Sequence, residues 1–171
     1  MKKKILTVFL AMTMLLSIFA IAPIAAGAVD TAVWDGTVAT KFAGGTGTPS
    51  SPFQISNGAE LAYLAKLVNN STGYELAYYE LTADIVLNEG DASTWEETAP
   101  ANSFTSIGTW AKAFGGNFDG KGHTISGLYI KTTADGQGMF GVIQGGAVIK
   151  NFALVNSYIK AGNNTLMNVR M

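Results

Sequence analysis

The chain has 171 residues and no cysteine, and 13% of its residues are charged while 48% are hydrophobic. Its formal net charge is −1, and this lack of a basic excess argues against a nucleic-acid or anionic-membrane partner, either of which needs a cationic face. Low charge together with many aromatic residues and glycines excludes an intrinsically disordered chain and favours packed strands joined by tight turns.

Residues 1–28 have the three parts of a secretory signal peptide. Three lysines follow Met1, an apolar run covers residues 5–22, and the small residues Ala26, Gly27 and Ala28 follow Pro23. We therefore predict export through the Sec pathway with cleavage after Ala28. The alternative is an uncleaved membrane anchor, because an apolar run of this length nearly spans a bilayer.

Cleavage after Ala28 would leave residues 29–171, without the three lysines at the start but with all 12 acidic side chains. This length suits one modest domain that is secreted or held at the cell surface, with no stable membrane insertion. Without cysteine, such a domain must be stable without disulfides.

One α-helix is predicted after a glycine- and proline-rich loop at residues 44–52. A first strand is expected near residues 37–42 and a short second one at Phe53–Ile55. Ser56 and Asn57 are N-cap candidates, apolar residues recur at helical spacing over 57–68, and residues 69–73 end the pattern. We expect this helix to cap the open first coil of a strand array.

The remainder of the chain is predicted to be strands and turns. Residues 79–87 alternate between apolar and polar, as in a strand with one buried face, and residues 88–93 look like an exposed loop. Further strands are expected near residues 104–107, 114–118, 124–130, 139–143 and 148–155, with turns at 119–122 and 144–146.

Residues 116–130 repeat the pattern of residues 140–154, so that Gly122 aligns with Gly146. A fixed period with glycine at the turns predicts a solenoid, here a right-handed parallel β-helix over residues 29–162 together with its N-terminal cap. Its apolar residues should stack between neighbouring coils, with Ile125 on Ile149, Leu128 on Phe152 and Ile130 on Leu154.

No catalytic, cofactor-binding or metal-binding residue is predicted. His123 is the only histidine and has no cysteine to join it in a zinc site. Asp84 and Asp119 could form a carboxylate pair for glycoside chemistry, but their positions in a strand alternation and an Asp-Gly turn favour surface and turn roles. The loop at residues 44–47 lacks the Gly-Lys-Ser/Thr ending of a phosphate loop.

Trp34, Trp95 and Trp110 are candidate ligand-facing aromatics, because exposed rings can form a platform on which sugars stack. The alternative is that they are core and edge residues of the solenoid. Asn88, Asn151 and Asn156 are expected at turns or in side-chain ladders.

Several segments resemble the N-terminal region of bacterial surface proteins that carry GLUG-type β-helix repeats. The resemblance covers roughly residues 34–162 and implies a parallel β-helix with an N-terminal helix, exported to the cell surface, without catalytic residues in this segment. The matching segments are Trp-Asp-Gly-Thr-Val-Ala at 34–39, Gly-Gly-Thr-Gly at 44–47, Pro-Phe-Gln-Ile at 52–55, Glu-Leu-Ala-Tyr-Leu-Ala at 60–65, Leu-Thr-Ala-Asp-Ile at 81–85, Phe-Asp-Gly-Lys-Gly-His-Thr-Ile at 118–125, Met-Phe-Gly at 139–141 and Ile-Lys-Asn-Phe at 149–152.

Residues 163–171 contain no glycine turn and no repeat, so an irregular tail and a fragment of a longer protein are expected. The predicted function is that of a non-catalytic, adhesion-type surface module whose partner is a host or cell-wall glycan or a surface protein. Two alternatives stay open. They are the accessory N-terminal region of a secreted peptidase or polysaccharide-degrading enzyme, and a carbohydrate-binding module.

Overall fold

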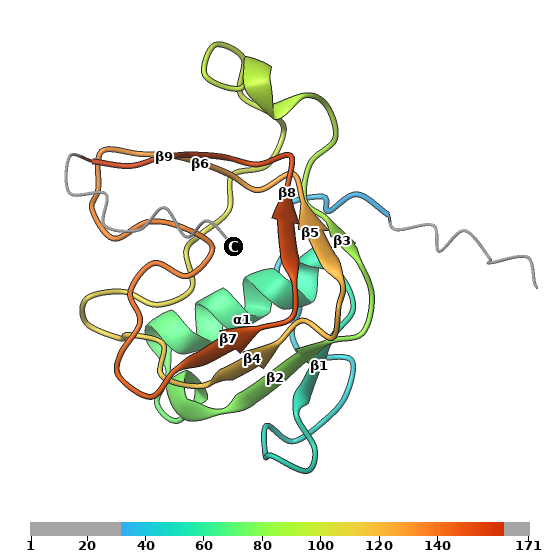
Figure 1. Ribbon diagram of the computed structural model, residues 1–171, viewed down its shortest axis with the longest axis vertical. Helices are drawn as coiled ribbons and strands as arrows, with labels where there is room; N and C mark the ends of the chain where they lie inside the picture. The colour runs from blue at the N-terminus through green and yellow to red at the C-terminus, as the bar shows by residue number, and fades with distance from the viewer. Residues whose placement is uncertain (1–31, 163–171) are drawn as a thin grey trace, which may run out of the picture. The chain divides into compact units, whose positions relative to one another are not determined.

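The computed structural model describes residues 32–162, whose arrangement is shown in Figure 1. The predicted signal peptide at 1–28 and the predicted tail at 163–171 lie outside the described residues. The described part consists mostly of short strands in parallel sheets. It also contains one α-helix, α1 (Gly58–Asn70), and two 3-10 helices, η1 (Tyr74–Leu76) and η2 (Ala92–Thr94). The prediction of a mainly β fold with one helix is confirmed at this level.

The strands form three sheets in which every pairing is parallel. In the view of Figure 1, the three sheets lie along different sides of α1. The first sheet has the order β1 (Phe53–Ile55), β2 (Tyr78–Leu81), β4 (Asn117–Asp119) and β7 (Val148–Lys150), the second has β3 (Ile85–Val86), β5 (Thr124–Ser126) and β8 (Ala153–Val155), and the third pairs β6 (Tyr129–Lys131) with β9 (Tyr158–Lys160).

The chain visits the three sheets in the same order twice. β4, β5 and β6 enter the first, second and third sheet in turn, and β7, β8 and β9 then pair with them in register. Because successive side chains of a strand point to opposite faces, equivalent residues of the two passes form columns on the same face of each sheet.

The predicted alignment of the two passes is wrong. It placed Ile125 on Ile149 and Ile130 on Leu154, whereas Ile125 is in register with Leu154 and Ile130 with Ile159. Paired residues of the two passes are therefore separated by more residues of sequence than the predicted alignment gave. This separation is larger still in the first sheet, because residues 120–123 connect β4 to β5 whereas only residues 151–152 connect β7 to β8.

The inward-facing columns form a continuous hydrophobic core. Tyr79, Phe118, Ile125 and Leu128 are each at most 1% exposed. Phe152, which the predicted alignment placed on Leu128, lies instead in the turn between β7 and β8 and packs from there against the core. α1 contributes Leu61, Leu64, Ala65 and Val68 to the same cluster.

Asn57, one of the two N-cap candidates in the sequence, is the N-cap of α1. Asn57 Oδ1 accepts a hydrogen bond from the Glu60 N–H at 3.0 Å, and the Glu60 carboxylate accepts one from the Ser56 N–H at 2.7 Å. These reciprocal contacts satisfy N–H groups that have no partner within the helix. The helix ends at Asn70, slightly beyond the predicted end at Val68.

Several predicted strands are shorter or absent in the structure. Residues 37–42 form no strand, and the predicted strands at 104–107 and 139–143 meet only through one isolated bridge, between Ile107 and Phe140. Each of the long predicted strands at 79–87, 124–130 and 148–155 is divided between two sheets. The reason is that the chain turns a corner within each of them, as at Gly127, whose φ is 75°.

The apolar columns are well buried near α1 and more exposed at β7, β8 and β9. Ile125 is completely buried, whereas its partner Leu154 is 37% exposed, and Ile130 is 3% exposed against 40% for Ile159. Among residues 32–162, these last three strands pair on one side only.

Candidate functional site

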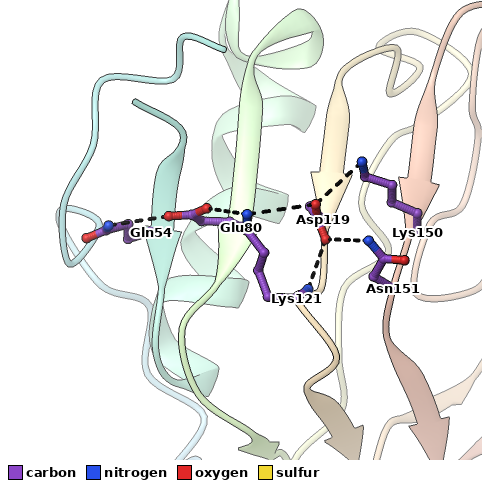
Figure 2. A network of polar contacts seen from close by, with 6 residues as sticks. All are labelled: Gln54, Glu80, Asp119, Lys121, Lys150 and Asn151. Atoms are coloured by element: carbon purple, nitrogen blue, oxygen red, sulfur yellow. Dashed lines mark hydrogen bonds and ion pairs between the residues drawn. The ribbon is translucent and has the colours of Figure 1, made fainter. Parts of the chain in front are cut away.

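A row of polar side chains crosses the outer face of the first sheet (Figure 2). Glu80 of β2 and Asp119 of β4 are in register, and Asp119 is in register with Lys150 of β7. Lys121 Nζ lies 3.4 Å from Glu80 Oε2 and 4.0 Å from Asp119 Oδ2, and Lys150 Nζ lies 3.5 Å from the same Asp119 oxygen. At the β1 edge, Gln54 Nε2 donates to Glu80 Oε1 at 3.4 Å.

Asp119 is the centre of this row. Its Oδ1 accepts hydrogen bonds from the Lys121 N–H at 2.9 Å and from Asn151 Nδ2 at 3.0 Å. The Lys121 backbone bond, followed by the Asn151 bond and the two lysine charges, lowers the pKa of Asp119 below its usual value. A carboxylate held ionised between two lysines connects neighbouring strands, so the row is a structural ladder.

Asp84 and His123 form a separate pair. Asp84 Oδ1 lies 3.1 Å from His123 Nδ1 and accepts a hydrogen bond from the Thr124 N–H at 2.8 Å. The Thr124 bond is the main cause of the lowered pKa of Asp84. Asp84 and Asp119 therefore have different partners, and each holds a turn, as the surface and turn interpretation predicted.

A third polar cluster attaches the segment around Glu96 to the third sheet. The Glu96 carboxylate accepts hydrogen bonds from the hydroxyl of Tyr158 and from Lys160 Nζ, both on β9. Lys131 Nζ of β6 donates to the Glu96 carbonyl oxygen at 2.6 Å. The Lys160 and Tyr158 bonds lower the pKa of Glu96, and the cluster connects strands rather than facing a cleft.

Two of the three candidate tryptophans do not face solvent. Trp34 is 8% exposed and packs edge-on against Phe104 with ring centroids 6.0 Å apart, and Trp95 is 3% exposed and packs against Tyr129 at 6.1 Å. Both are core residues, which corrects the suggestion that they form a stacking platform. Trp110, in contrast, is 77% exposed.

Residues 32–162 contain no group of three or more His, Asp or Glu side chains placed to hold a metal ion. Within the same range, no helix has the length and apolar character needed to cross a bilayer.

The structure brings together an aromatic pocket that the sequence did not reveal. It has a volume of about 220 Å³ and lies between α1, η1, β1 and the segment that precedes β1. That volume is below the roughly 300–1,000 Å³ of sites for drug-sized ligands, so it suits a single ring. Its side chains are Lys41, Phe42, Phe53, Tyr63, Leu67 and Tyr74.

The rings of this aromatic pocket hold one another in place. Phe42 stacks on Phe53 with centroids 4.6 Å apart, Tyr63 lies 5.1 Å from Phe42, and Tyr74 lies 5.9 Å from Phe53. Phe42 and Phe53 come together because residues 43–54 fold back on themselves, with the Ala43 N–H donating to the Gln54 carbonyl oxygen at 3.1 Å.

Glycine is required where this fold-back is tightest. Gly45 has a φ of 80°, and a Cβ atom there would lie 1.7 Å from the Pro52 carbonyl oxygen. The sequence signals that could have found the pocket are the two phenylalanines flanking the glycine-rich loop and the i, i+4 spacing of Tyr63 and Leu67 on α1.

The chain is similar to two much longer proteins. It is 35% identical over 130 residues to Halomucin of Haloquadratum walsbyi, a match that covers 75% of this chain and 1% of Halomucin. It is 32% identical over 123 residues to a protein of Evansella cellulosilytica named as a Gly-rich membrane protein, covering 69% of this chain and 12% of that protein. The chain thus spans only a small part of either relative. No family model and no solved structure matches it.

Proposed function

We propose that the described residues form the first coils of a right-handed parallel β-helix with α1 as its cap, and that the chain is a non-catalytic surface module. The observation that carries this proposal is the in-register addition of β7, β8 and β9 to β4, β5 and β6. Stacked units of this kind build an extended scaffold whose outer faces are free to bind partners.

Export and surface location are supported from two sides. Residues 1–28 have the pattern of a cleaved signal peptide, and the relatives carry the names Halomucin and Gly-rich membrane protein. A GLUG-type adhesion role, with a glycan or surface protein as partner, agrees with the sequence resemblance. The accessory region of a secreted enzyme is the second candidate, since the matched relatives are far longer than this chain.

The test of export is to express the full chain in a bacterial host and sequence the N-terminus of the protein outside the cytoplasm. Cleavage predicts Val29 as the first residue. The variant Ala28→Lys, which removes a small residue that the peptidase reads, should keep Met1 and serve as the control. Wild-type protein that keeps Met1 and stays in the membrane would contradict the proposal.

The coil geometry is tested by cysteine pairs, because the chain has no cysteine of its own. Lys131 and Lys160 are in register on β6 and β9, and adjacent strands lie about 4.8 Å apart, within disulfide range. The double variant Lys131→Cys/Lys160→Cys should therefore oxidise to a disulfide. The matched control is Lys131→Cys/Val155→Cys, which follows the alignment of 116–130 on 140–154 instead of the observed register and should stay reduced.

The absence of catalysis is tested separately on purified protein from residue 29 onward, with a panel of polysaccharides and peptides. We expect no turnover. Hydrolysis that is abolished by Asp84→Asn or by Asp119→Asn would overturn the proposal and favour a carbohydrate-active enzyme.

A further inference from the structure

We propose that the aromatic pocket between α1, η1 and β1 binds one pyranose ring of an acidic glycan, with Lys41 pairing with the sugar carboxylate. This inference rests on the proposed surface role and names the ligand class that such a module would take.

The pocket wall has the chemistry that sugar rings stack on. Phe53, Tyr63 and Tyr74 are only partly buried, so their rings are accessible at the wall. The face of an aromatic ring is electron-rich, and the C–H groups on one face of a pyranose carry partial positive charge. Stacking therefore buries the apolar face of the sugar, while its hydroxyls stay free to hydrogen-bond at the rim.

The charge of the pocket favours an anion. Lys41 lines it, and no Asp or Glu side chain does. Among residues 32–162, no side chain forms an ion pair with Lys41, and no group accepts a hydrogen bond from the hydroxyl of Tyr63 or Tyr74. Within residues 32–162, one ammonium and two phenol hydroxyls therefore have no partner of their own and can contact a carboxylate and the ring hydroxyls of a uronate.

The pocket is also preorganised for a rigid ligand. Phe53 is packed so closely on the loop that a Cβ atom at Gly47 would lie 2.3 Å from its ring, and Gly45 leaves no space for any side chain. Fixed rings lose little conformational freedom on binding, which is how a small site gains affinity. Trp110, the exposed alternative, forms no ring pair with another aromatic side chain among residues 32–162.

The experiment uses the mature exported protein and two probes of the same linkage, oligogalacturonate and its fully methyl-esterified form. The ester keeps the sugar ring and removes the negative charge. Calorimetric titration should show wild-type protein binding the acid about tenfold more tightly than the ester.

Two variants separate charge from stacking. Lys41→Gln should weaken binding of the acid about tenfold and leave binding of the ester unchanged, and Tyr74→Ala should weaken both about tenfold. Lys66→Gln, which removes an exposed lysine of α1 outside the pocket, is the matched control and should bind like wild type. Circular dichroism melting of each variant checks that the fold is kept.

Two results would overturn the pocket proposal. One is that wild-type protein, shown to be folded, binds neither probe. The other is that binding is lost in Trp110→Ala but unchanged in Lys41→Gln and Tyr74→Ala. N-terminal sequencing of the same preparation distinguishes the proposals, because a protein that begins at Val29 and fails to bind refutes the pocket while the export proposal stands.

Discussion

The side-chain amide of Asn88 donates a hydrogen bond to the carbonyl oxygen of Gly127 at 2.8 Å, across 39 residues of sequence. The same amide nitrogen donates to the Asn102 carbonyl oxygen, and Asn88 Oδ1 accepts from the Asn102 N–H, both at 2.8 Å. Asn88 is 3% exposed, which corrects its assignment to an exposed loop. It closes the excursion at residues 89–101 and fixes that loop to the turn between β5 and β6.

Replacing Asn88 by Ala should destabilise the fold by about 2–4 kcal/mol, because it leaves the buried Gly127 carbonyl and the Asn102 backbone groups without a partner. The measurement is the free energy of unfolding from urea titration. Asn70→Ala is the control, since Asn70 is exposed and its amide bonds only the Lys66 carbonyl within α1. A loss of less than about 1 kcal/mol in Asn88→Ala would contradict this role.

Phe118→Ala should cost about 3–5 kcal/mol, because Phe118 is completely buried and contacts Phe140 and Phe152. Phe152→Ala should cost less, about 1–2 kcal/mol, since Phe152 lies in a turn and is only partly buried. The two variants are compared by their urea midpoints at equal slope. Equal losses of unfolding free energy in the two variants would contradict this, because they would show that Phe152 in the turn is as well packed as Phe118 in the strand.

Gly108 and Gly122 have nearly the same φ, 88° and 87°, in different surroundings. A Cβ atom at Gly108 would lie 2.3 Å from the Val142 carbonyl oxygen, whereas at Gly122 it would meet no atom within 4 Å. Gly122→Ala should therefore cost only the left-handed backbone strain, about 1–2 kcal/mol. Gly108→Ala adds a steric clash and should cost about 2–5 kcal/mol in all. Thermal melting of both variants tests this prediction, since Gly108→Ala should lower the melting temperature more than Gly122→Ala.

The lowered pKa of Asp119 predicts a dependence of stability on pH. Because its pKa in the folded state lies below the unfolded value of about 3.9, the ionised carboxylate stabilises the fold above that pH. The contribution is lost as the pH falls through the lowered pKa. Asp119→Asn should cost about 0.5–1 kcal/mol at pH 7, and its difference from wild type should shrink as the pH falls through the lowered pKa of Asp119. Glu89→Gln, which changes an exposed carboxylate outside the ladder, is the control and should keep the stability of wild type at pH 7.

Local signals in the sequence predicted the elements that depend on neighbouring residues. The start of α1 follows from Asn57 and Glu60. Asn151 and Asn156, for which the sequence left a turn or a side-chain ladder open, have positive φ angles of 58° and 44°, although Asn151 falls within the strand predicted over residues 148–155. The aromatic pocket could not be predicted in this way, because Phe42 and Tyr74 meet in space through the fold-back of the loop.

The register between the two passes was predicted wrongly because glycine was taken as the marker of every turn. In the structure, Asn151 has a positive φ in the turn where Lys121 and Gly122 have one a pass earlier, and Asn156 has a positive φ at the position equivalent to Gly127. An alignment based on glycines alone therefore paired the strands of the first pass with the wrong residues of the second pass. The correct signal was the tripeptide Tyr-Ile-Lys, which occurs at 129–131 and again at 158–160 and whose copies pair residue by residue.

In the proposed β-helix, the contrast in exposure between the two ends of the strand columns would make β7, β8 and β9 the side on which further coils add. Duplication of the unit that carries β7, β8 and β9 would set its new strands on the free edges of these strands and bury Leu154 and Ile159. Each copied unit would thus pack on the apolar residues of the unit before it, and the strands at the β1 end would stay unchanged. A solenoid that adds coils at that side would keep β1 and β2 unchanged while its length changes.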